Sequence, residues 1–394
     1  IYQTSIFEYM VILGFALFSC HGFRIRSDLM FFEILMLLFP LFFLTAEAAS
    51  KYMFFTLVGI YYYFRIQEDY EMFYAIRLPI MAFGVFTALV TWFSFFFPFA
   101  YVGHVLPLLP ESEALAYSFT RRNMYMGFTT HYSRNAFYIL LAIQLLFSEL
   151  YCRKGRKMKK SLPGILLLLF LFLTELLVAK RGPLLFLILS LMLLVILKDP
   201  GLSGKLKKTM IYAAAVFILG VLAVWLVPGA DNIVVRMAAS IQTGDITTGR
   251  LALYRVGVGM FLEHPLFGCG WDSFRRVVWG ATDQGVHNDY IQLLGETGII
   301  GFLMVMTANF YGLAYTMRAY RRFRGNACSG TREQIGLSFC LAYQIFFLLD
   351  SLTGLPHFSY EINTLYLMTC GYGVGVYQKS RRAELAEAEE ERRE

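Results

Sequence analysis

Two neighbouring stretches decide the fold: Leu162–Ala179, LPGILLLLFLFLTELLVA, and Pro183–Leu197, PLLFLILSLMLLVIL. A helix needs about 20 mostly apolar residues to cross a hydrocarbon core. Because these apolar residues are continuous rather than alternating, they predict helices and not the strands of a membrane barrel. The whole chain is 57% hydrophobic and 16% charged, whereas soluble domains carry about 25% charge. The sequence therefore predicts an all-α, polytopic membrane protein.

The same pattern predicts eleven spanning helices in the 394 residues. They cover 7–20, 29–45, 51–64, 79–99, 136–151, 162–179, 183–198, 210–228, 289–316, 334–350 and 359–377. The first residue is Ile rather than Met, and no cleavable signal pattern follows it. We therefore expect an N-terminal piece with a twelfth helix to precede residue 1.

Lysine and arginine orient these helices, because short cytoplasmic loops carry the basic excess. The segment Cys152–Lys160, CRKGRKMKK, is the strongest anchor and is expected to lie inside. Alternation from it puts 24 of the 35 lysines and arginines in inside segments and leaves two long outside loops, 100–134 and 229–288. This distribution explains the net charge of +7 without nucleic acid as a partner.

Four parts follow from this reading. We expect an N-terminal transmembrane helix bundle at 1–228, an extracytoplasmic loop at 229–288 with an amphipathic helix over 250–262, C-terminal transmembrane helices at 289–378, and a charged cytoplasmic tail at 379–394. The six cysteines show no metal-ligand spacing, and the outside loops contain no Asp-x-Asp. We therefore expect no metal and no cofactor.

The candidate site is a set of polar residues at the predicted outer face. Arg181 lies at a helix end, Arg250 and Arg255 lie in the amphipathic stretch, and His287 begins the next span. The planar fork of arginine binds phosphate bidentately. A histidine at a helix N-terminus is kept neutral by the helix dipole and accepts a proton. Taken singly, these residues are also explained as membrane anchors, lipid head-group contacts and a helix cap.

Residues Gly249–Gly301 resemble the core of the O-antigen ligase and polymerase superfamily. The first motif has Arg, a short helix, Pro-x-x-Gly-x-Gly and an aromatic residue, which here are Arg250, Pro265, Gly268, Gly270 and Phe274. The second motif has His-Asn-x-Tyr, Leu, Glu-x-Gly and Gly, which here are His287, Asn288, Tyr290, Leu294, Glu296, Gly298 and Gly301. Upstream, KRGPLLFL resembles the family's Arg-Gly at a helix end, with Arg181 at that position.

The resemblance implies glycosyl transfer without nucleotide sugars or metal, from a glycan carried on undecaprenyl diphosphate. It implies that Arg181 and Arg250 hold the diphosphate and that His287 activates the acceptor hydroxyl. We add Arg255, Arg134 and Asn288 as candidate substrate contacts. The expected location is the bacterial inner membrane, with the site facing the periplasm or exterior, in the assembly of O-antigen, capsule or exopolysaccharide.

Three alternatives stay open. Within the family, a polymerase joins lipid-linked repeats and a ligase moves the glycan to another acceptor. A transporter or flippase for lipid-linked glycans would use ionisable residues inside spanning helices, of which Glu33 and Glu175 are the chief ones. A scaffold or receptor would leave the His-Asn-x-Tyr motif unexplained. We also expect Glu175 to make an interhelical hydrogen bond, and Gly295, Gly298 and Gly301 to form a close-packing helix face.

Overall fold

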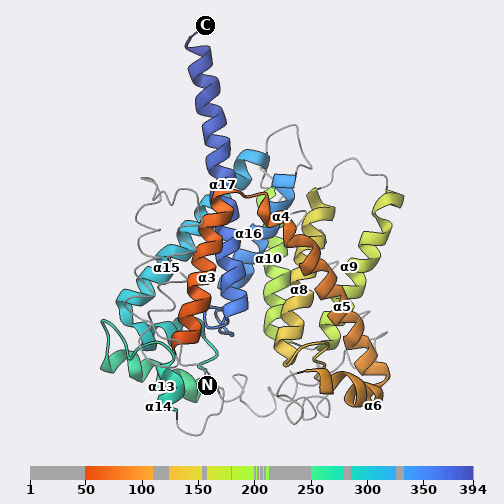
Figure 1. The fold of residues 1–394 in the computed structure, drawn as a ribbon, viewed down its shortest axis with the longest axis vertical. Coiled ribbons are helices and arrows are strands. Elements are labelled where there is room, and N and C mark those ends of the chain that lie inside the picture. The colour runs from red at the N-terminus through yellow and green to blue at the C-terminus, as the bar shows by residue number, and fades with distance from the viewer. Residues whose placement is uncertain are drawn as a thin grey trace. The chain divides into compact units, whose positions relative to one another are not determined.

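A computed structural model of the chain describes a large part of the sequence. The described residues are 49–109, 124–152, 158–178, 180–198, 201, 204, 207, 210–212, 250–278, 285–324 and 332–393. Throughout these ranges the regular elements are helices (Figure 1), which confirms the all-α prediction. The predicted spans 7–20 and 29–45, and nearly all of 210–228, lie outside the described residues.

A helix covers most of each predicted span that lies within the described residues, although several helices run past the predicted ends. They are α3 (Ala49–Glu68), α4 (Met72–Ala75), α5 (Arg77–Phe96), α6 (Pro98–Ala100), α8 (Tyr132–Cys152), α9 (Met158–Val178), α10 (Arg181–Lys198), α13 (Arg250–Glu263), α14 (Ser273–Val277), α15 (Asp289–Arg324), α16 (Arg332–Asp350) and α17 (Tyr360–Glu391). A π-helical turn, Tyr101–Val105, and a 3-10 turn, Leu106–Leu108, follow α6. The predicted end of one span at residue 99 is three residues late, because Pro98 starts a new helix after α5.

Several of these helices suit a membrane. Among the described residues, Met72–Phe96, Tyr132–Cys152 and Asp289–Phe323 are long and apolar enough to cross one. Leu162–Val178 and Arg181–Leu197 are shorter apolar helices. The chain is therefore a polytopic helical membrane protein, and the full number of spans stays a prediction.

The described residues pack as two compact units. Unit 1 comprises 1–73, 247–323 and 347–394, and unit 2 comprises 74–246 and 324–346. Helix α16 begins in unit 2 and its last residues belong to unit 1.

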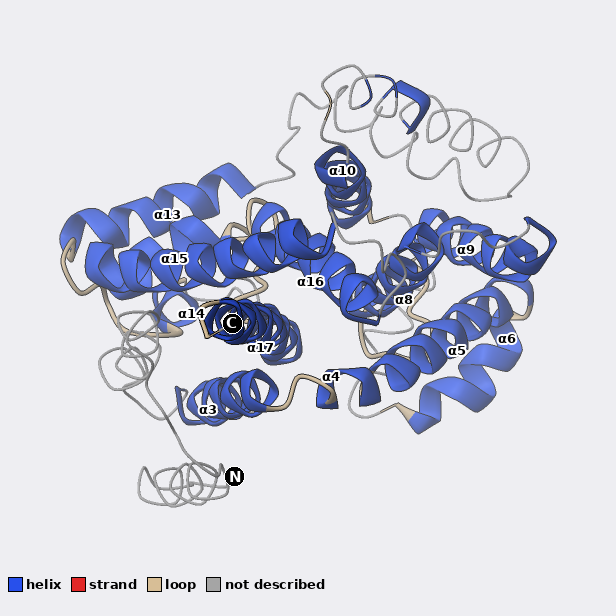
Figure 2. Cartoon of the chain, turned by 90° about the horizontal axis from the view of Figure 1, so that it is seen from above, coloured by secondary structure: helices blue, strands red, loops and turns tan. Residues whose placement is uncertain are grey.

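In unit 1, glycines let α17 approach its neighbours closely. A Cβ on Gly371 would collide with the carbonyl oxygen of Tyr63 in α3, and one on Gly375 would lie 2.9 Å from that of Gln67. The residue numbers rise together along both helices, so α3 and α17 run parallel (Figure 1). Gly373 faces the other way, against Thr316 of α15, and Figure 2 shows α17 between α3 and α15. Small residues at helix contacts are a common way to pack helices in membranes.

In unit 2, a buried hydrogen-bond network joins α5 to α8. Asn135 donates from Nδ2 to Thr91 Oγ1 at 2.8 Å and to the Tyr125 carbonyl at 3.0 Å. Its Oδ1 accepts from Thr87 Oγ1 at 2.9 Å. Interhelical polar contacts of this kind hold membrane helices together. The network fixes the first turn of α8, the turn that also carries Arg134.

Glu175 behaves differently from our expectation. Its side chain in α9 is fully buried, yet neither carboxylate oxygen has a hydrogen-bond partner in the part of the chain that the structure describes. The neighbouring Thr174 does bridge helices, since its hydroxyl accepts from Trp92 Nε1 at 2.9 Å. The expected interhelical hydrogen bond is therefore made one residue earlier.

We predict that Gly371→Ala destabilises the protein by about 1–3 kcal/mol, the usual cost of overpacking. The added methyl group would press on the Tyr63 backbone, which cannot move without shifting α3. Thermal unfolding in detergent, followed by intrinsic fluorescence, measures the effect as a lower Tm.

Gly259→Ala is the matched control, because nothing lies within 4 Å of the added Cβ there. It should leave the Tm unchanged or slightly raised, since alanine favours helix over glycine. An equal Tm for the parent and Gly371→Ala would contradict the close packing of α3 on α17.

Candidate functional site

The candidate site is built around a break in α15. Gly298 has φ 62 and ψ −170, so α15 consists of two helices that meet at this residue. The break frees carbonyl groups at the end of the first helix and N–H groups at the start of the second. Buried groups of this kind need partners.

The loop Pro265–Gly270 provides these partners. Cys269 N donates to the Gly295 carbonyl at 3.2 Å, and Gly270 N donates to that of Glu296 at 2.8 Å. In the opposite direction, Ile299 N donates to the Pro265 carbonyl at 2.8 Å and Ile300 N to that of Leu266 at 3.2 Å. We call this contact, between residues 265–270 and 295–300, the interlock.

Two glycines make the interlock possible. Gly268 has φ 68, and a Cβ there would lie 2.5 Å from Thr297 N. A Cβ on Gly298 would lie 2.6 Å from Phe267 N. Both positions need the left-handed backbone that glycine adopts freely, and both need its lack of a side chain. The Pro-x-x-Gly-x-Gly and Glu-x-Gly motifs are therefore the two halves of one contact.

Gly295 has the packing role that the sequence predicted. A Cβ on it would lie 2.8 Å from the carbonyl oxygen of Gly257 in α13, and one on Gly257 would lie 2.8 Å from Ile291. Helix α13 thus lies against the first half of α15, with Met260 in the same buried cluster. The predicted helix over 250–262 is confirmed, but its apolar side chains do not gather on one face.

Glu296 ties the interlock to α14. Its Oε2 accepts from Asp272 N at 2.6 Å, and its Oε1 accepts from Phe274 N at 3.2 Å and from Gln292 Nε2 at 3.1 Å. The carboxylate thus satisfies N–H groups at the start of α14, which have no partner within that helix. Glu296 is buried, so it acts here as a structural acceptor.

The turn before α15 carries His287 and Asn288. His287 is half-buried and has φ 58, a left-handed conformation that is uncommon for residues other than glycine. Asn288 caps the helix, because its Oδ1 accepts from Ile291 N at 3.1 Å. Its Nδ2 donates to the Leu352 carbonyl at 3.1 Å. The side-chain amide therefore fixes the turn at both ends.

Residues 351–357, SLTGLPH, form a second anchor that the sequence analysis missed; we call them the anchor turn. Asp289 Oδ2 accepts from His357 Nδ1 at 2.6 Å, from His357 N at 2.9 Å and from Ser351 Oγ at 3.1 Å. His357 Nε2 lies 2.7 Å from Asn309 Nδ2. Because Nδ1 faces a carboxylate, it carries the proton, and Nε2 accepts from the Asn309 amide. The four side chains are buried.

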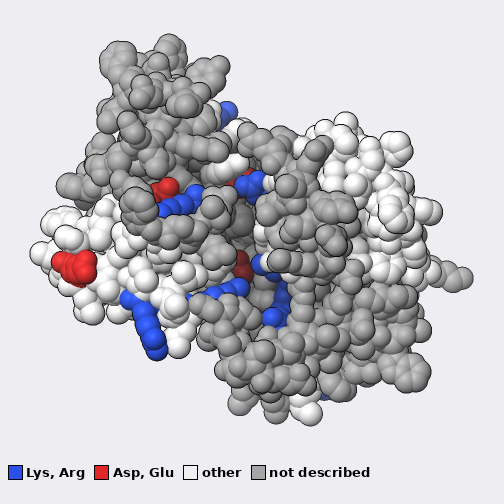
Figure 3. Space-filling model, turned by 90° about the horizontal axis from the view of Figure 1, so that it is seen from below, with Lys and Arg blue, Asp and Glu red and all other residues white. Residues whose placement is uncertain are grey.

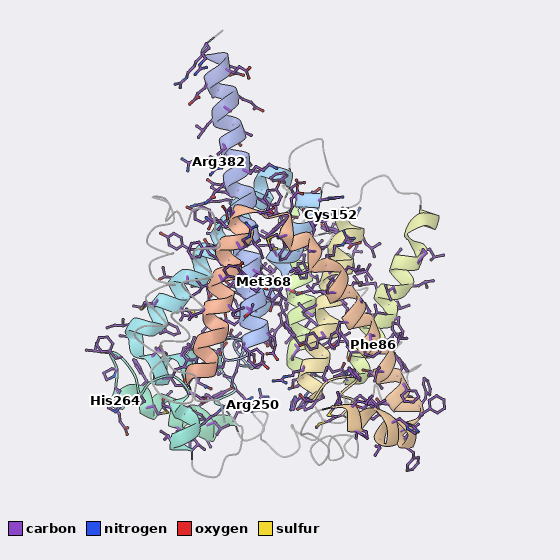
Figure 4. All side chains as sticks on the ribbon, in the orientation of Figure 1. Phe86, Cys152, Arg250, His264, Met368 and Arg382 are labelled. Atoms are coloured by element: carbon purple, nitrogen blue, oxygen red, sulfur yellow. The ribbon has the colours of Figure 1, made fainter. Side chains whose placement is uncertain are left out.

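Arg250 reaches the same turn. As the first residue of α13 it donates from Nη1 to the Thr353 carbonyl at 3.3 Å, next to the Leu352 carbonyl that Asn288 uses. Figure 4 labels Arg250 at the start of α13 and His264 beyond its end. The structure thus brings Arg250 together with the His287–Asn288 turn. Arg255, one turn further along α13, is exposed.

The other two predicted arginines belong to unit 2. Arg181 is the half-buried first residue of α10, and exposed Arg134 lies in the first turn of α8, where its Nη1 donates to Thr130 Oγ1 at 3.1 Å. Lys180 lies over the Tyr132 ring, 4.7 Å from its centroid. This contact brings the starts of α8 and α10 together, so Arg134 and Arg181 share one end of unit 2.

Cys269 stands inside the interlock but is a poor nucleophile. Burial, with the charges of Glu263 and Glu296, raises the pKa of its thiol. The Cys269 thiol is therefore a weaker nucleophile near neutral pH than an ordinary cysteine thiol.

A family comparison covers most of these residues. Residues 164–306 match the model of a family described as O-antigen ligase. These residues belong to the O-antigen ligase superfamily. The matched segment contains Arg181, Arg250, Arg255, His287, Asn288 and the whole interlock, whereas Arg134 and the anchor turn lie outside it. No curated protein matches the chain.

The match of residues 164–306 to the O-antigen ligase family indicates the general activity. It indicates glycosyl transfer of the ligase or polymerase type, in polysaccharide assembly, with a lipid-linked glycan and a glycan acceptor as substrates. With the apolar helices, it indicates a membrane protein of the bacterial inner membrane.

We predict that Glu296→Gln loosens α14. Gln keeps one acceptor oxygen but sets an amide N–H against a backbone N–H, so one of the N–H groups of Asp272 and Phe274 loses its acceptor. A buried donor left without a partner costs about 1–3 kcal/mol, so amide exchange over 271–278 should be about tenfold faster. Hydrogen–deuterium exchange with peptide mass analysis measures this.

Glu387→Gln in the exposed part of α17 is the matched control and should leave exchange over 271–278 unchanged. If amide exchange over 271–278 is unaltered in Glu296→Gln, the Glu296 side chain does not stabilise α14.

Proposed function

We propose that the protein is an inverting, metal-independent glycosyltransferase that moves a glycan from undecaprenyl diphosphate to an acceptor hydroxyl on the extracytoplasmic side of the membrane. The observation that carries the proposal is the convergence of Arg250 and the His287–Asn288 turn on adjacent carbonyls of the anchor turn. An arginine fork and a half-buried histidine are held together there, within the segment that matches the O-antigen ligase family.

The chemistry is a single displacement. His287 takes the proton of the acceptor hydroxyl, and the oxygen attacks the anomeric carbon opposite the diphosphate. The bond from that carbon to the diphosphate oxygen breaks, and the diphosphate leaves with the electron pair. Attack from the opposite side inverts the anomeric centre. His287 lies at the N-terminal end of α15, where the positive end of the helix dipole disfavours imidazolium.

Arginines stabilise the charge that develops on the leaving diphosphate. Arg250 uses Nη1 on the Thr353 carbonyl, which fixes the fork and leaves its remaining N–H groups for phosphate oxygens. Arg181, which lies in the same family-matched segment, is proposed as a further diphosphate contact. Arg255 and Arg134 are proposed as further substrate contacts, and Asn288 as one through its second Nδ2 hydrogen.

We predict that His287→Ala and Arg250→Ala abolish glycan transfer in proteoliposomes while expression is preserved. Loss of a general base costs about 10²–10⁴ in rate. Arg250→Lys should keep part of the activity, because it retains the charge but loses the bidentate fork. Single-turnover transfer from a purified lipid-linked donor is the measurement.

Arg382→Ala, on the exposed tail of α17, is the matched arginine control (Figure 4) and should transfer normally. Full activity of His287→Ala would refute the role of His287 as base, and full activity of Arg250→Ala would refute the role of Arg250 in holding the diphosphate.

Between the two family activities we favour polymerase, because nothing in the sequence motifs or in the described residues points to an outer-membrane acceptor. We predict a ladder of repeats on undecaprenyl diphosphate when the purified protein receives only lipid-linked repeat units. Gel analysis of the lipid-linked products detects it. Transfer only after addition of a second carrier would instead make the protein a ligase.

A transporter or flippase of lipid-linked glycans is the alternative from another class. Its supporting observation is Glu175, a buried carboxyl in α9 with no hydrogen-bond partner among the described residues. Movement of labelled donor across a vesicle without any new glycosidic bond would favour it.

A further inference from the structure

Helix α13 has an unusual exposed face. Leu251, Val258 and Leu262 are exposed, Leu262 with 71% of its surface. Spacings of seven and four residues place them on one side of a helix. The opposite side, with Gly257 and Met260, packs against α15. Apolar residues thus occupy both faces, as expected for a helix with protein on one side and an apolar medium on the other.

The exposed face continues past the end of α13 into the interlock. Leu266 and Phe267 are 58% and 57% exposed. The Leu266 carbonyl accepts the hydrogen bond from Ile300 N at 3.2 Å, so Leu266 lies directly beside Ile300. Ile300 and Leu303 are exposed apolar residues of α15, a helix long and apolar enough to span a membrane.

This continuity identifies the medium. Exposed apolar side chains on a spanning helix face lipid, and a residue hydrogen-bonded to that helix lies at the same depth. Non-helical backbone is tolerated at such depth only where its polar groups are satisfied. The interlock does this for Pro265, Leu266, Cys269 and Gly270 through α15, and Gly268 N donates to the His264 carbonyl at 2.9 Å.

We propose that α13 and the Leu266–Phe267 segment lie in the membrane leaflet at the N-terminal end of α15, with the stripe Leu251, Val258, Leu262, Leu266 and Phe267 against the acyl chains. Arg255 lies on the same side of α13, four residues after Leu251, where an exposed guanidinium meets phosphates at the membrane surface, those of lipid head groups and of a lipid-linked donor alike. An exposed arginine within the stripe suits a lipid surface better than a second apolar protein face. Seen from below, the described surface is mostly uncharged with scattered basic and acidic groups (Figure 3).

The inference does not depend on the glycosyl-transfer proposal, because its test is physical. Single tryptophans are introduced as Phe267→Trp and, outside the tightly packed interlock, Leu262→Trp. The full chain is reconstituted into phosphatidylcholine vesicles with or without bromine atoms on the acyl chains. The signal of the added tryptophan is obtained by subtracting the fluorescence of the parent protein from that of the variant.

Leu303→Trp is the control inside the membrane, and Leu385→Trp, on the exposed tail of α17, is the control in water. We expect brominated lipid to quench the tryptophans at 267 and 262 to within about twofold of its quenching of the tryptophan at 303. We expect aqueous acrylamide to quench the tryptophans at 267 and 262 much less than the tryptophan at 385. That result supports the proposal.

Two other outcomes overturn it. Quenching at 267 and 262 by acrylamide, as at 385, would place the stripe in water. Protection from both quenchers would mean that protein covers it, either another part of the chain or a second copy. Because two positions are tested, failure of one variant to fold still leaves a result.

Discussion

The rest of the candidate site depends on the interlock between residues 265–270 and the break in α15. A helix that stops and restarts inside an apolar run leaves backbone groups that neither water nor lipid satisfies at that position. Here a loop from the preceding segment donates two hydrogen bonds and accepts two, at 2.8–3.2 Å. The break is therefore stabilised by specific hydrogen bonds. The same contact fixes the segment between the end of α13 and the start of α14.

The position of the reactive side chains follows from two anchors of different chemistry. The interlock and the Glu296 carboxylate hold α13 and α14 against α15. The buried Asp289–His357 contact and the Asn288 amide hold the His287 turn on residues 351–357. Arg250, at the start of α13, reaches the anchor turn. Both proposed catalytic groups, Arg250 and His287, are thus held by these two anchors. The anchors limit the motion of the two side chains, as a preorganised site requires.

The sequence predicted the helices well and their contacts less well. Long apolar runs give α8, α9 and α10 directly, because a spanning helix needs only length and hydrophobicity. The break at Gly298 leaves no such trace, since the run GIIGFLMVM is apolar throughout. His357 was missed because its partner, Asp289, is 68 positions away in the chain, and Asp289 occupies only the variable position of His-Asn-x-Tyr. Gly295 was correctly read as a packing glycine, whereas Gly298 instead provides the left-handed turn.

The motif that resembles the O-antigen ligase superfamily therefore separates into two kinds of residue. Gly268, Gly270, Glu296 and Gly298 have structural reasons for their identity. The three glycines have a positive φ, and Gly268 and Gly298 also leave no room for a Cβ. Glu296 accepts hydrogen bonds from the start of α14. None of these reasons involves a substrate. Arg250 and His287 are different. The one hydrogen bond to the Thr353 carbonyl uses a single N–H of the Arg250 guanidinium. A glycine or asparagine would adopt the left-handed turn at 287 more easily than histidine. Where the fold alone would favour another residue, a chemical role is the better explanation of the one present.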